Sequence, residues 1–390
     1  MADILLESSQ TGKREDLSDL IATADRKNTP FYNGVRKGAV PKNVVFQWQM
    51  DKYNDPVADT SETAAASGND LTGVSSTIDG TDASTSDGFA DSNTRQLAQN
   101  YVHTFDKTVG IGFLAEDVST VAGAPSELAR SVARRIVEMK REIEKHMLSN
   151  SNAVSQVTGT ATNATGYKTK ALGSFIHENG KAAETSGIMG GTDAFTVNSN
   201  FRPTATNSAG TAANIWTGAS STITEGVIQD TLQGIYDKTG TIRDYTAVVG
   251  TTLKRKFTNL ASTNTVTSTI QHTADPSGNS NPPGTELSAY PGIAADRTRS
   301  VTKDQSSKSY ISSIDIFEGD FGTITLVPDH YVDNAANGYI IPFDECELAV
   351  HTAPNVSELT NNGGGERRLL RAIMGLKVFN PLSFGRVRSA

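Results

Sequence analysis

The stretch PSELARSVARRIVEMKREIEKHMLS, residues 125–149, is the clearest element of the sequence. Apolar side chains recur along it three or four residues apart, a pattern typical of an amphipathic helix with one buried stripe. The stripe consists of Leu128, Val132, Ile136, Met139, Ile143 and Met147. Pro125 suits the first turn and Ser126 suits the N-cap, so we expect the helix to begin there. At about 1.5 Å per residue, the helix would be a rod of about 36 Å.

The other faces of this helix are charged, and we expect them to face water or a partner. They carry Arg134, Arg135, Glu138, Lys140, Arg141, Glu142, Glu144 and Lys145. Like-charge and opposite-charge pairs four residues apart nearly cancel, so burial of the stripe must hold the helix in place. We expect His146, in the last turn, to be a solvated residue that the helix C-terminus favours.

A ribbon of two strands is predicted before the helix. In VPKNVVFQWQMDKYN, residues 40–54, Phe46, Trp48 and Met50 alternate with glutamines. The stretch 95–107 alternates again, and we expect the two to form the arms of one long hairpin. Its apolar positions are Leu97, Tyr101, His103 and Phe105. The residues between the arms, 54–94, hold eight acidic side chains and no lysine or arginine, which is typical of a solvated tip.

The remaining elements predict a mixed domain followed by strands. We expect a short amphipathic helix over 14–25, an ordered island at 170–180 and a helix after the capping box at Thr222–Glu225. A strand, a turn and a helix are expected over 245–262. The alternation predicts strands within 309–332, 338–351 and 366–381. In the last of these, we expect one face to be a core face, formed by Leu370, Ala372, Met374, Leu376 and Val378. The tracts 150–222 and 263–308 are otherwise polar.

Bulk composition excludes several classes of protein. The chain has 390 residues and a formal net charge of −8, which argues against a dedicated nucleic-acid binder. Its single cysteine, Cys346, excludes an intramolecular disulfide, and glutamates on both sides should raise the pKa of its thiol. No signal peptide and no membrane span are expected.

No catalytic constellation is visible. The chain lacks a nucleophile elbow, paired zinc-binding histidines, a phosphate-binding loop and a dinucleotide fingerprint. The acidic residues Asp79, Asp82, Asp87 and Asp91 do not match a calcium loop. Lys254, Arg255 and Lys256 suit one solvated turn of a helix, with contact to phosphate as the minority alternative. We therefore expect neither an enzyme nor a bound metal or cofactor.

The order of these elements resembles the major capsid proteins of tailed bacteriophages, which share the Hong Kong 97 fold. The resemblance rests on 28–56 (NTPFYNGVRKGAVPKNVVFQWQMDKYNDP), on the helix from Ser126, and on the strands of 314–332, 338–351 and 370–381. It implies an α+β fold with an N-terminal arm (1–40) and a hairpin called the E-loop (41–108). It further implies a P domain with the long spine helix (109–150), an A domain (151–308), P-domain strands (309–381) and a tail (382–390).

The resemblance also implies a function, namely self-assembly into hexamers and pentamers that form an icosahedral or prolate head shell around double-stranded DNA. The chain would be made in the bacterial cytoplasm and end in the virion. Expected partners are other copies, the portal, scaffold or decoration proteins, and packaged DNA by non-specific proximity. Candidate contacts between subunits are Phe46, Trp48, Met50, Tyr101 and Phe105. On this view, replacing Trp48 with Asp should impair assembly more than folding.

Two other functions are compatible with parts of the sequence. A secreted or tail-associated adhesive β protein would suit the tracts rich in serine, threonine, glycine and asparagine, but the long helix counts against it. A hydrolase with an unrecognised site is disfavoured by the missing constellations.

Overall fold

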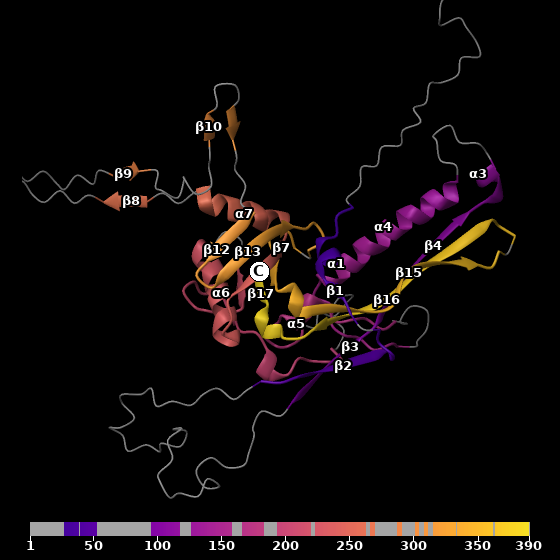
Figure 1. Ribbon diagram of the computed structural model, residues 1–390, viewed down its shortest axis with the longest axis horizontal. Helices are drawn as coiled ribbons and strands as arrows, with labels where there is room; N and C mark the ends of the chain where they lie inside the picture. The colour runs from indigo at the N-terminus through magenta and orange to yellow at the C-terminus, as the bar shows by residue number, and fades with distance from the viewer. Residues whose placement is uncertain are drawn as a thin grey trace, which may run out of the picture.

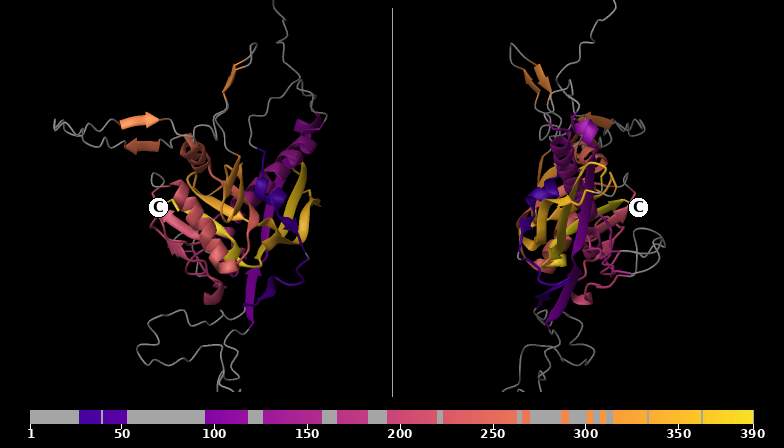
Figure 2. Two further views of the ribbon diagram at one scale, coloured as in Figure 1. Left: turned by 60° about the vertical axis from the view of Figure 1, so that its left-hand side comes forward. Right: turned by 90° about the vertical axis from the view of Figure 1, so that its right-hand side faces the viewer.

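Two sheets organise the part of the chain that the structure describes. The structure is a computed structural model, and it describes residues 27–38, 40–52, 95–117, 126–157, 166–182, 193–219, 223–262, 266–269, 287–290, 301–303, 308–310, 315–332, 334–361 and 363–389. A four-stranded sheet and the long helix form a projecting blade (Figure 1). A seven-stranded sheet with two helices lies beside its inner end, as the rotated views also show (Figure 2). The α+β fold class predicted from the sequence is confirmed.

Helix α4 (Glu127–Met147) confirms the predicted long helix. Ser126 is its N-cap, and the Ser126 hydroxyl accepts a hydrogen bond from the backbone N–H of Ala129 at 3.2 Å. The stripe packs on β4 and β16: Leu128, Met139, Ile143 and Met147 are buried, and Val132 and Ile136 pack against the same core. Each fully buried large apolar side chain contributes roughly 1.5–3 kcal/mol, so this stripe is what fixes the helix on the sheet.

The blade's sheet has the strand order β1-β15-β16-β4. Its strands are β1 (Arg36–Lys37), β15 (Cys346–Leu359), β16 (Glu366–Val378) and β4 (His103–Ile111). Strand β16 pairs antiparallel with both β15 and β4, while β1 pairs parallel with β15. The core face predicted for β16 is confirmed, because alternate residues from Leu370 to Val378 are at most 1 % exposed.

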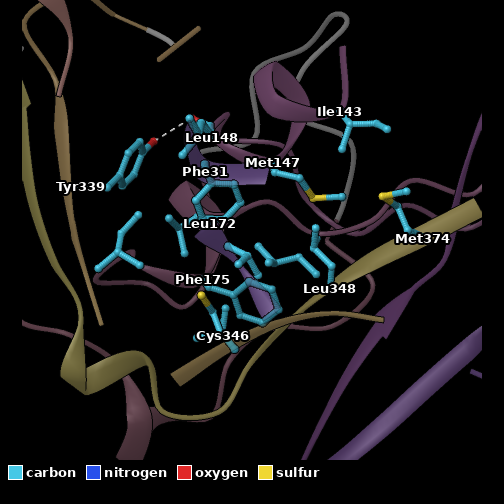
Figure 3. Close-up of a cluster of buried hydrophobic side chains, with 14 of the residues drawn as sticks. Phe31, Ile143, Met147, Leu148, Leu172, Phe175, Tyr339, Cys346, Leu348 and Met374 are labelled. Atoms are coloured by element: carbon cyan, nitrogen blue, oxygen red, sulfur yellow. Dashed lines mark hydrogen bonds between the residues drawn. The ribbon is translucent and has the colours of Figure 1, made fainter. Parts of the chain in front are cut away.

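The core of the blade continues into the seven-stranded sheet (Figure 3). The hydroxyl of Tyr339, on β14, donates a hydrogen bond to the backbone carbonyl of Leu148 at 3.1 Å, just past the end of α4. Cys346 is buried in this cluster at the start of β15. Burial, with Asp344 and Glu345 adding to it, raises the pKa of its thiol to about 12.

The seven-stranded sheet has the order β12-β13-β7-β14-β17-β6-β5. Its strands are β12 (Ile316–Gly319), β13 (Gly322–Pro328), β7 (Arg243–Val249), β14 (Gly338–Ile341), β17 (Gly385–Ser389), β6 (Ile215–Gly218) and β5 (Ala205–Thr206). Two predicted helices are present, α6 (Glu225–Thr239) and α7 (Thr251–Ser262). Thr224 caps α6, since its hydroxyl accepts the N–H of Val227.

The strands of this sheet correct two expected boundaries. We expected 309–381 to supply strands of the long helix's sheet, but β13 pairs parallel with β7 over seven residues, and β12 and β14 join the same sheet. We expected 382–390 to be a tail, but β17 pairs with β14 and β6. Alternation predicts that a segment is a strand, while its partner depends on contacts distant in sequence, so the error lay in the pairing.

Smaller elements complete the described chain. They are α1 (Pro30–Gly34), α3 (Phe113–Asp117), α5 (Leu172–Phe175), β2 (Val45–Met50), β3 (Gln96–Tyr101) and the pairs β8 (Val266–Thr269) with β9 (Leu287–Tyr290) and β10 (Val301–Lys303) with β11 (Lys308–Tyr310). Three further segments, 199–201, 343–345 and 381–383, are single 3-10 turns. The predicted island at 170–180 is ordered around the buried α5. The predicted helix over 14–25 and the tip over 54–94 lie outside the described residues.

Two side chains of α4 are not solvated as expected. Glu144 is completely buried. His146 is largely buried, its Nε2 donating to the backbone carbonyl of Thr169 at 3.1 Å and its ring packing edge-on against His103. Both residues lie on the flank of the stripe where the end of α4 enters the core. Burial lowers the pKa of His146 to about 4, and burial together with His146 lowers the pKa of His103 to about 3.

These two histidines predict a loss of stability in acid. Both are neutral in the folded chain, whereas the unfolded chain binds protons at the ordinary pKa of 6.5. The free energy of unfolding should therefore fall as the pH falls below 6.5, by about 1.4 kcal/mol per pH unit for each histidine. Urea unfolding of the full chain between about pH 6.5 and about pH 4.5 measures this slope.

A matched pair of variants isolates the effect. His146→Gln keeps a donor for the Thr169 carbonyl and should reduce the slope, whereas His351→Gln, at an exposed position, should leave it unchanged. The same slope in wild type and both variants would contradict the assignment to these buried rings.

Candidate functional site

The predicted ribbon exists, but it is shorter than expected at one end. Strands β2 and β3 pair antiparallel, from Val45 opposite Tyr101 to Met50 opposite Gln96. The chain then leaves the ribbon at Val102 and enters β4, which pairs with β16. His103 and Phe105 therefore belong to the blade and not to the hairpin. One continuous alternation covers both strands, so the sequence contained no signal for the change of partner.

The ribbon has one face turned toward its own subunit. Phe46, Trp48 and Met50 lie on it, together with their cross-strand partners Asn100, Ala98 and Gln96. Trp48 is 7 % exposed and Met50 is 6 % exposed. The indole N–H of Trp48 donates to the backbone carbonyl of Val378 at 3.0 Å, and its ring contacts those of Phe46 and Phe175. This face anchors the ribbon to the end of β16.

A glycine in β16 makes room for the ribbon. A Cβ built on Gly375 would lie 2.5 Å from the ring of Phe46 and 2.8 Å from the backbone oxygen of Tyr101. No side chain fits there without moving the ribbon. The base of the ribbon thus lies directly on the backbone of the blade's sheet.

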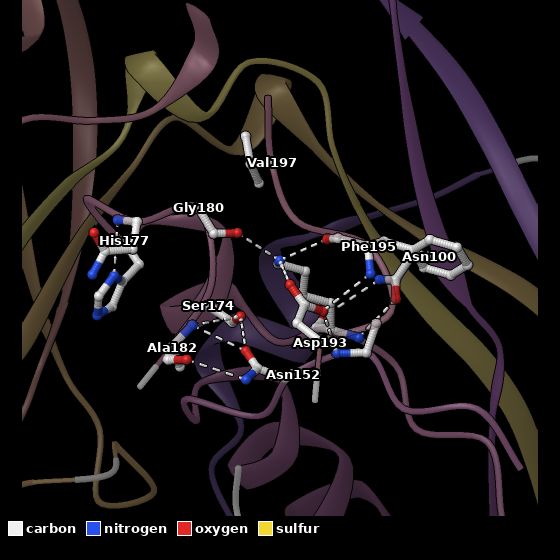
Figure 4. Close-up of polar contacts among 12 residues, drawn as sticks. Asn100, Asn152, Ser174, His177, Gly180, Ala182, Asp193, Phe195 and Val197 are labelled. Carbon is white, nitrogen blue, oxygen red and sulfur yellow. Dashed lines mark hydrogen bonds and ion pairs between the residues drawn. The ribbon is translucent and has the colours of Figure 1, made fainter. Parts of the chain in front are cut away.

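A buried polar cluster holds the inner end of the ribbon (Figure 4). The side chain of Asn100 accepts the N–H of Lys170 at 2.7 Å and donates to the carbonyl of Leu376 at 2.6 Å. The ammonium of Lys170 lies 2.5 Å from Asp193 Oδ2 and also donates to the carbonyls of Gly180 and Phe195. Three acceptors satisfy the three N–H groups of the ammonium, so the charge can be buried.

Electrostatics make this cluster sensitive to the loss of either charge. The side chains of Lys170 and Asp193 are both 0 % exposed. Burial lowers the pKa of Lys170, and the carboxylate of Asp193 opposes that shift. Asp193 Oδ1 in turn accepts the N–H of Ala153 at 3.1 Å. Strand β3, the loop before α5 and the loop at 193–195 are therefore joined through one ion pair.

The other face of the ribbon is turned outward. Gln47 and Gln49 are exposed on it, and Leu97 is 52 % exposed. Tyr101 is half-buried and packs against the rings of Tyr167 and Phe195. Beside the ribbon, a cavity of about 270 Å³ opens between β3 and the loop at 194–198, with Trp48, Met50 and Phe175 among its walls.

The five predicted contact residues therefore separate into two groups. Trp48, Met50 and Phe105 are buried in the subunit's own core and expose little surface. Phe46 and Tyr101 are partly buried, and Phe46 also lies on the face that is turned toward its own subunit. That any of them contacts a neighbouring subunit stays a prediction. The outward side chain with the most apolar surface on this ribbon, Leu97, was not among our candidates because its polar neighbours weaken the pattern.

The polar cluster was not predicted from the sequence either. Asn100 is in register with the buried face of β3, and Lys170 is the first residue of the ordered island, so both occupy positions where an apolar residue would be expected. A polar side chain at such a position was the signal that could have indicated a buried polar cluster. The partner Asp193 lies within a polar tract that gave no indication of burial.

The anchoring of Trp48 revises the expected effect of its replacement. Trp48→Ala removes a buried ring and its hydrogen bond, so the free energy of unfolding should fall by about 3–5 kcal/mol. Gln47→Ala, on the outward face, should change it by no more than about 0.5 kcal/mol. Urea unfolding of the full chain checks both values, and equal stability of the two variants would show that the ribbon does not belong to the subunit core.

The ion pair gives a second prediction. Lys170→Met leaves the carboxylate of Asp193 buried without its partner and should lower the free energy of unfolding by about 3–5 kcal/mol. Combining it with Asp193→Leu should recover much of that loss. Equilibrium unfolding of the single and double variants checks this, and a double variant no more stable than Lys170→Met would argue against an uncompensated charge as the cause.

Neither a metal centre nor a membrane span is indicated in the described part of the chain. No group of three or more histidine, cysteine, aspartate or glutamate side chains is placed there to hold a metal ion. Within the same residues, none of the helices combines the length and the apolar content needed to cross a bilayer.

Comparisons with known proteins agree with this architecture. The SU10 major capsid protein family matches residues 6–280 and 283–390. A capsid protein of cyanophage A-1(L) has a similar structure, with a TM-score of 0.52, 12 % identity and 96 % of each chain covered. A structure from Mycobacterium phage Bobi has a TM-score of 0.50 and 10 % identity, covering 97 % of this chain and 96 % of that one. No curated protein matched the sequence.

The family match covers nearly the whole chain, and the similar structures show the same fold. The expected Hong Kong 97 fold and the expected place in the virion shell are confirmed, and a shell protein is favoured over the adhesive and hydrolase alternatives. The chain belongs to the SU10 major capsid protein family and forms the head shell of a tailed phage.

Proposed function

We propose that the chain assembles into hexamers and pentamers in which the ribbon β2–β3 of one subunit lies across the blade of the next. The observation that carries this proposal is the division of the ribbon into two faces. One face is fixed on its own subunit by Trp48 and Asn100, and the other presents Leu97 and two glutamines to the outside.

The blade offers a suitable opposite surface. On the side of its sheet away from α4, Leu369 and Ile373 are half-buried, and Thr104 and Thr108 are exposed. Arg371 and Asp106 form a two-pronged ion pair on this side at 2.9 and 3.0 Å. Apolar area beside satisfied polar groups is typical of interfaces between subunits. The ribbon's own Phe46 already covers Gly375 at the inner end of this face, so a neighbour's ribbon would continue the same layer.

Weak contacts of this kind are sufficient in a closed shell. Each subunit would give one ribbon and receive one, so the same heterologous contact repeats around a ring. Once a ring forms, every further contact is intramolecular, and many weak contacts add to a stable shell. We propose that the portal, a scaffold or decoration protein, and packaged DNA by non-specific proximity are the remaining partners. Catalysis has no part in this function.

A pair of matched variants tests the ribbon contact. Leu97→Asp places a charge on the ribbon's outward face and should abolish or strongly reduce particle formation without lowering the free energy of unfolding. Ile242→Asp places the same charge at a similarly exposed apolar position, 63 % against 52 %, away from the ribbon. It should assemble as wild type does. Electron microscopy and analytical ultracentrifugation of the purified chain measure both.

Two outcomes would contradict the proposal. If Leu97→Asp formed normal particles, the outward face of the ribbon would not be part of the interface between subunits. If the wild-type chain stayed monomeric, or formed only a trimeric fibre, the proposed hexamers and pentamers would be wrong.

A further inference from the structure

A buried carboxyl group on α4 holds the segment before β1. Glu144 is completely buried, and its Oε1 accepts the backbone N–H of Phe31 at 2.7 Å while its Oε2 accepts that of Tyr32 at 2.6 Å. These N–H groups belong to the first turn of α1 (Pro30–Gly34), which has no side-chain cap of its own. One side chain of the long helix thus supplies the cap of a helix more than a hundred residues earlier in the chain.

A second buried carboxyl group faces the first. Asp329, just after β13, is 4 % exposed, and its Oδ1 accepts the N–H of Tyr331 at 2.9 Å. Its Oδ2 is buried and receives no hydrogen bond from the donors of the described residues. The side chain of Glu144 is within hydrogen-bonding reach of Asp329, so a proton on Glu144 would supply the missing donor.

Burial and the charge of Asp329 favour one proton held by Glu144. Burial is the largest cause that raises the pKa of Glu144, to about 8; the charge of Asp329 adds to it, and the N–H groups of Tyr32 and Phe31 oppose it. The pKa of Asp329 is also raised by burial, and the N–H of Tyr331, a proton donated by Glu144 and the nearby His330 oppose that shift. Lys37 on β1 interacts electrostatically with Glu144 and with Lys140, one turn earlier on α4, and this cation opposes the effect of burial on Glu144.

We propose that Glu144 and Asp329 form a proton-dependent latch that holds the segment Thr29–Lys37 against α4. With a proton between them, the two carboxyl groups are hydrogen-bonded and α1 is capped. Without it, two buried carboxylates repel each other, and α1 is released from the helix. The latch joins three parts of the subunit, namely the segment around Phe31, helix α4 and the end of β13. It is a property of the single chain and does not depend on the ribbon contact between subunits.

The direction of the pH effect follows from the two protonation states. In the released form Glu144 titrates near its ordinary value of 4.5, and in the latched form near 8. The latched form therefore binds more protons between these values, and the latch weakens as the pH rises through this window. Above about pH 8 the effect levels off.

Hydrogen–deuterium exchange of the full chain tests the proposal. We expect the protection of the Phe31 and Tyr32 amides, corrected for the intrinsic exchange rate, to fall about five- to tenfold between about pH 6.8 and about pH 7.8. This interval lies above the range in which His103 and His146 change charge. Glu144→Gln should abolish the change, because a neutral amide cannot lose the proton.

Two further variants keep the test decisive. Asp329→Asn removes the repulsion from the other side and should reduce the change without abolishing it, because burial still raises the pKa of Glu144; this variant serves if Glu144→Gln fails to fold. Glu142→Gln, at the exposed carboxylate that pairs with Lys107, is the control and should keep it. Protection that is independent of pH in wild type, or that changes equally in wild type, Glu144→Gln and Asp329→Asn, would overturn the proposal.

Discussion

The packing of one helical stripe against one sheet face is the contact on which the other parts of this subunit depend. Helix α4 has a balanced set of surface charges and no strong internal stabilisation, so it needs the apolar face of β4 and β16. That face in turn exists only because β16 alternates over its full length. The segment around Phe31, the buried histidines and the anchor of Tyr339 all lie on the inner end of this packed layer.

The same layer sets the direction of the ribbon. Strand β3 passes directly into β4 through Val102, so the ribbon joins the sheet at a fixed place. The indole of Trp48, the side chain of Asn100 and the bare backbone at Gly375 then hold its inner face. A ribbon fixed in this way has already lost backbone freedom in the single subunit, and such preorganisation lowers the entropic cost of a contact made by its outer face.

The features that could be predicted from the sequence are those that depend on residues close to one another in the chain. The stripe from Leu128 to Met147, the cap at Ser126 and the core face of β16 could all be predicted because period and capping are properties of neighbouring residues. Strand partners could not, so β12, β13, β14 and β17 were assigned to the wrong sheet or to a tail. The buried polar groups were missed for a related reason. Lys170, Asp193 and Glu144 are charged in sequence, and only the folded chain supplies the acceptors and donors that allow their burial.

The strand order of the seven-stranded sheet has a consequence for the timing of folding during synthesis. Strand β6 pairs with β5 on one side and with β17 on the other, and β17 lies about 170 residues later in the chain. At about 5–20 residues per second, β6 leaves the ribosome about ten to thirty seconds before its partner. During that time its free edge is open to other nascent chains. The two strands are only two and four residues long, and short edges are poor templates for unwanted pairing. The shortness of β5 and β6 thus limits unwanted pairing between nascent chains until β17 has been made.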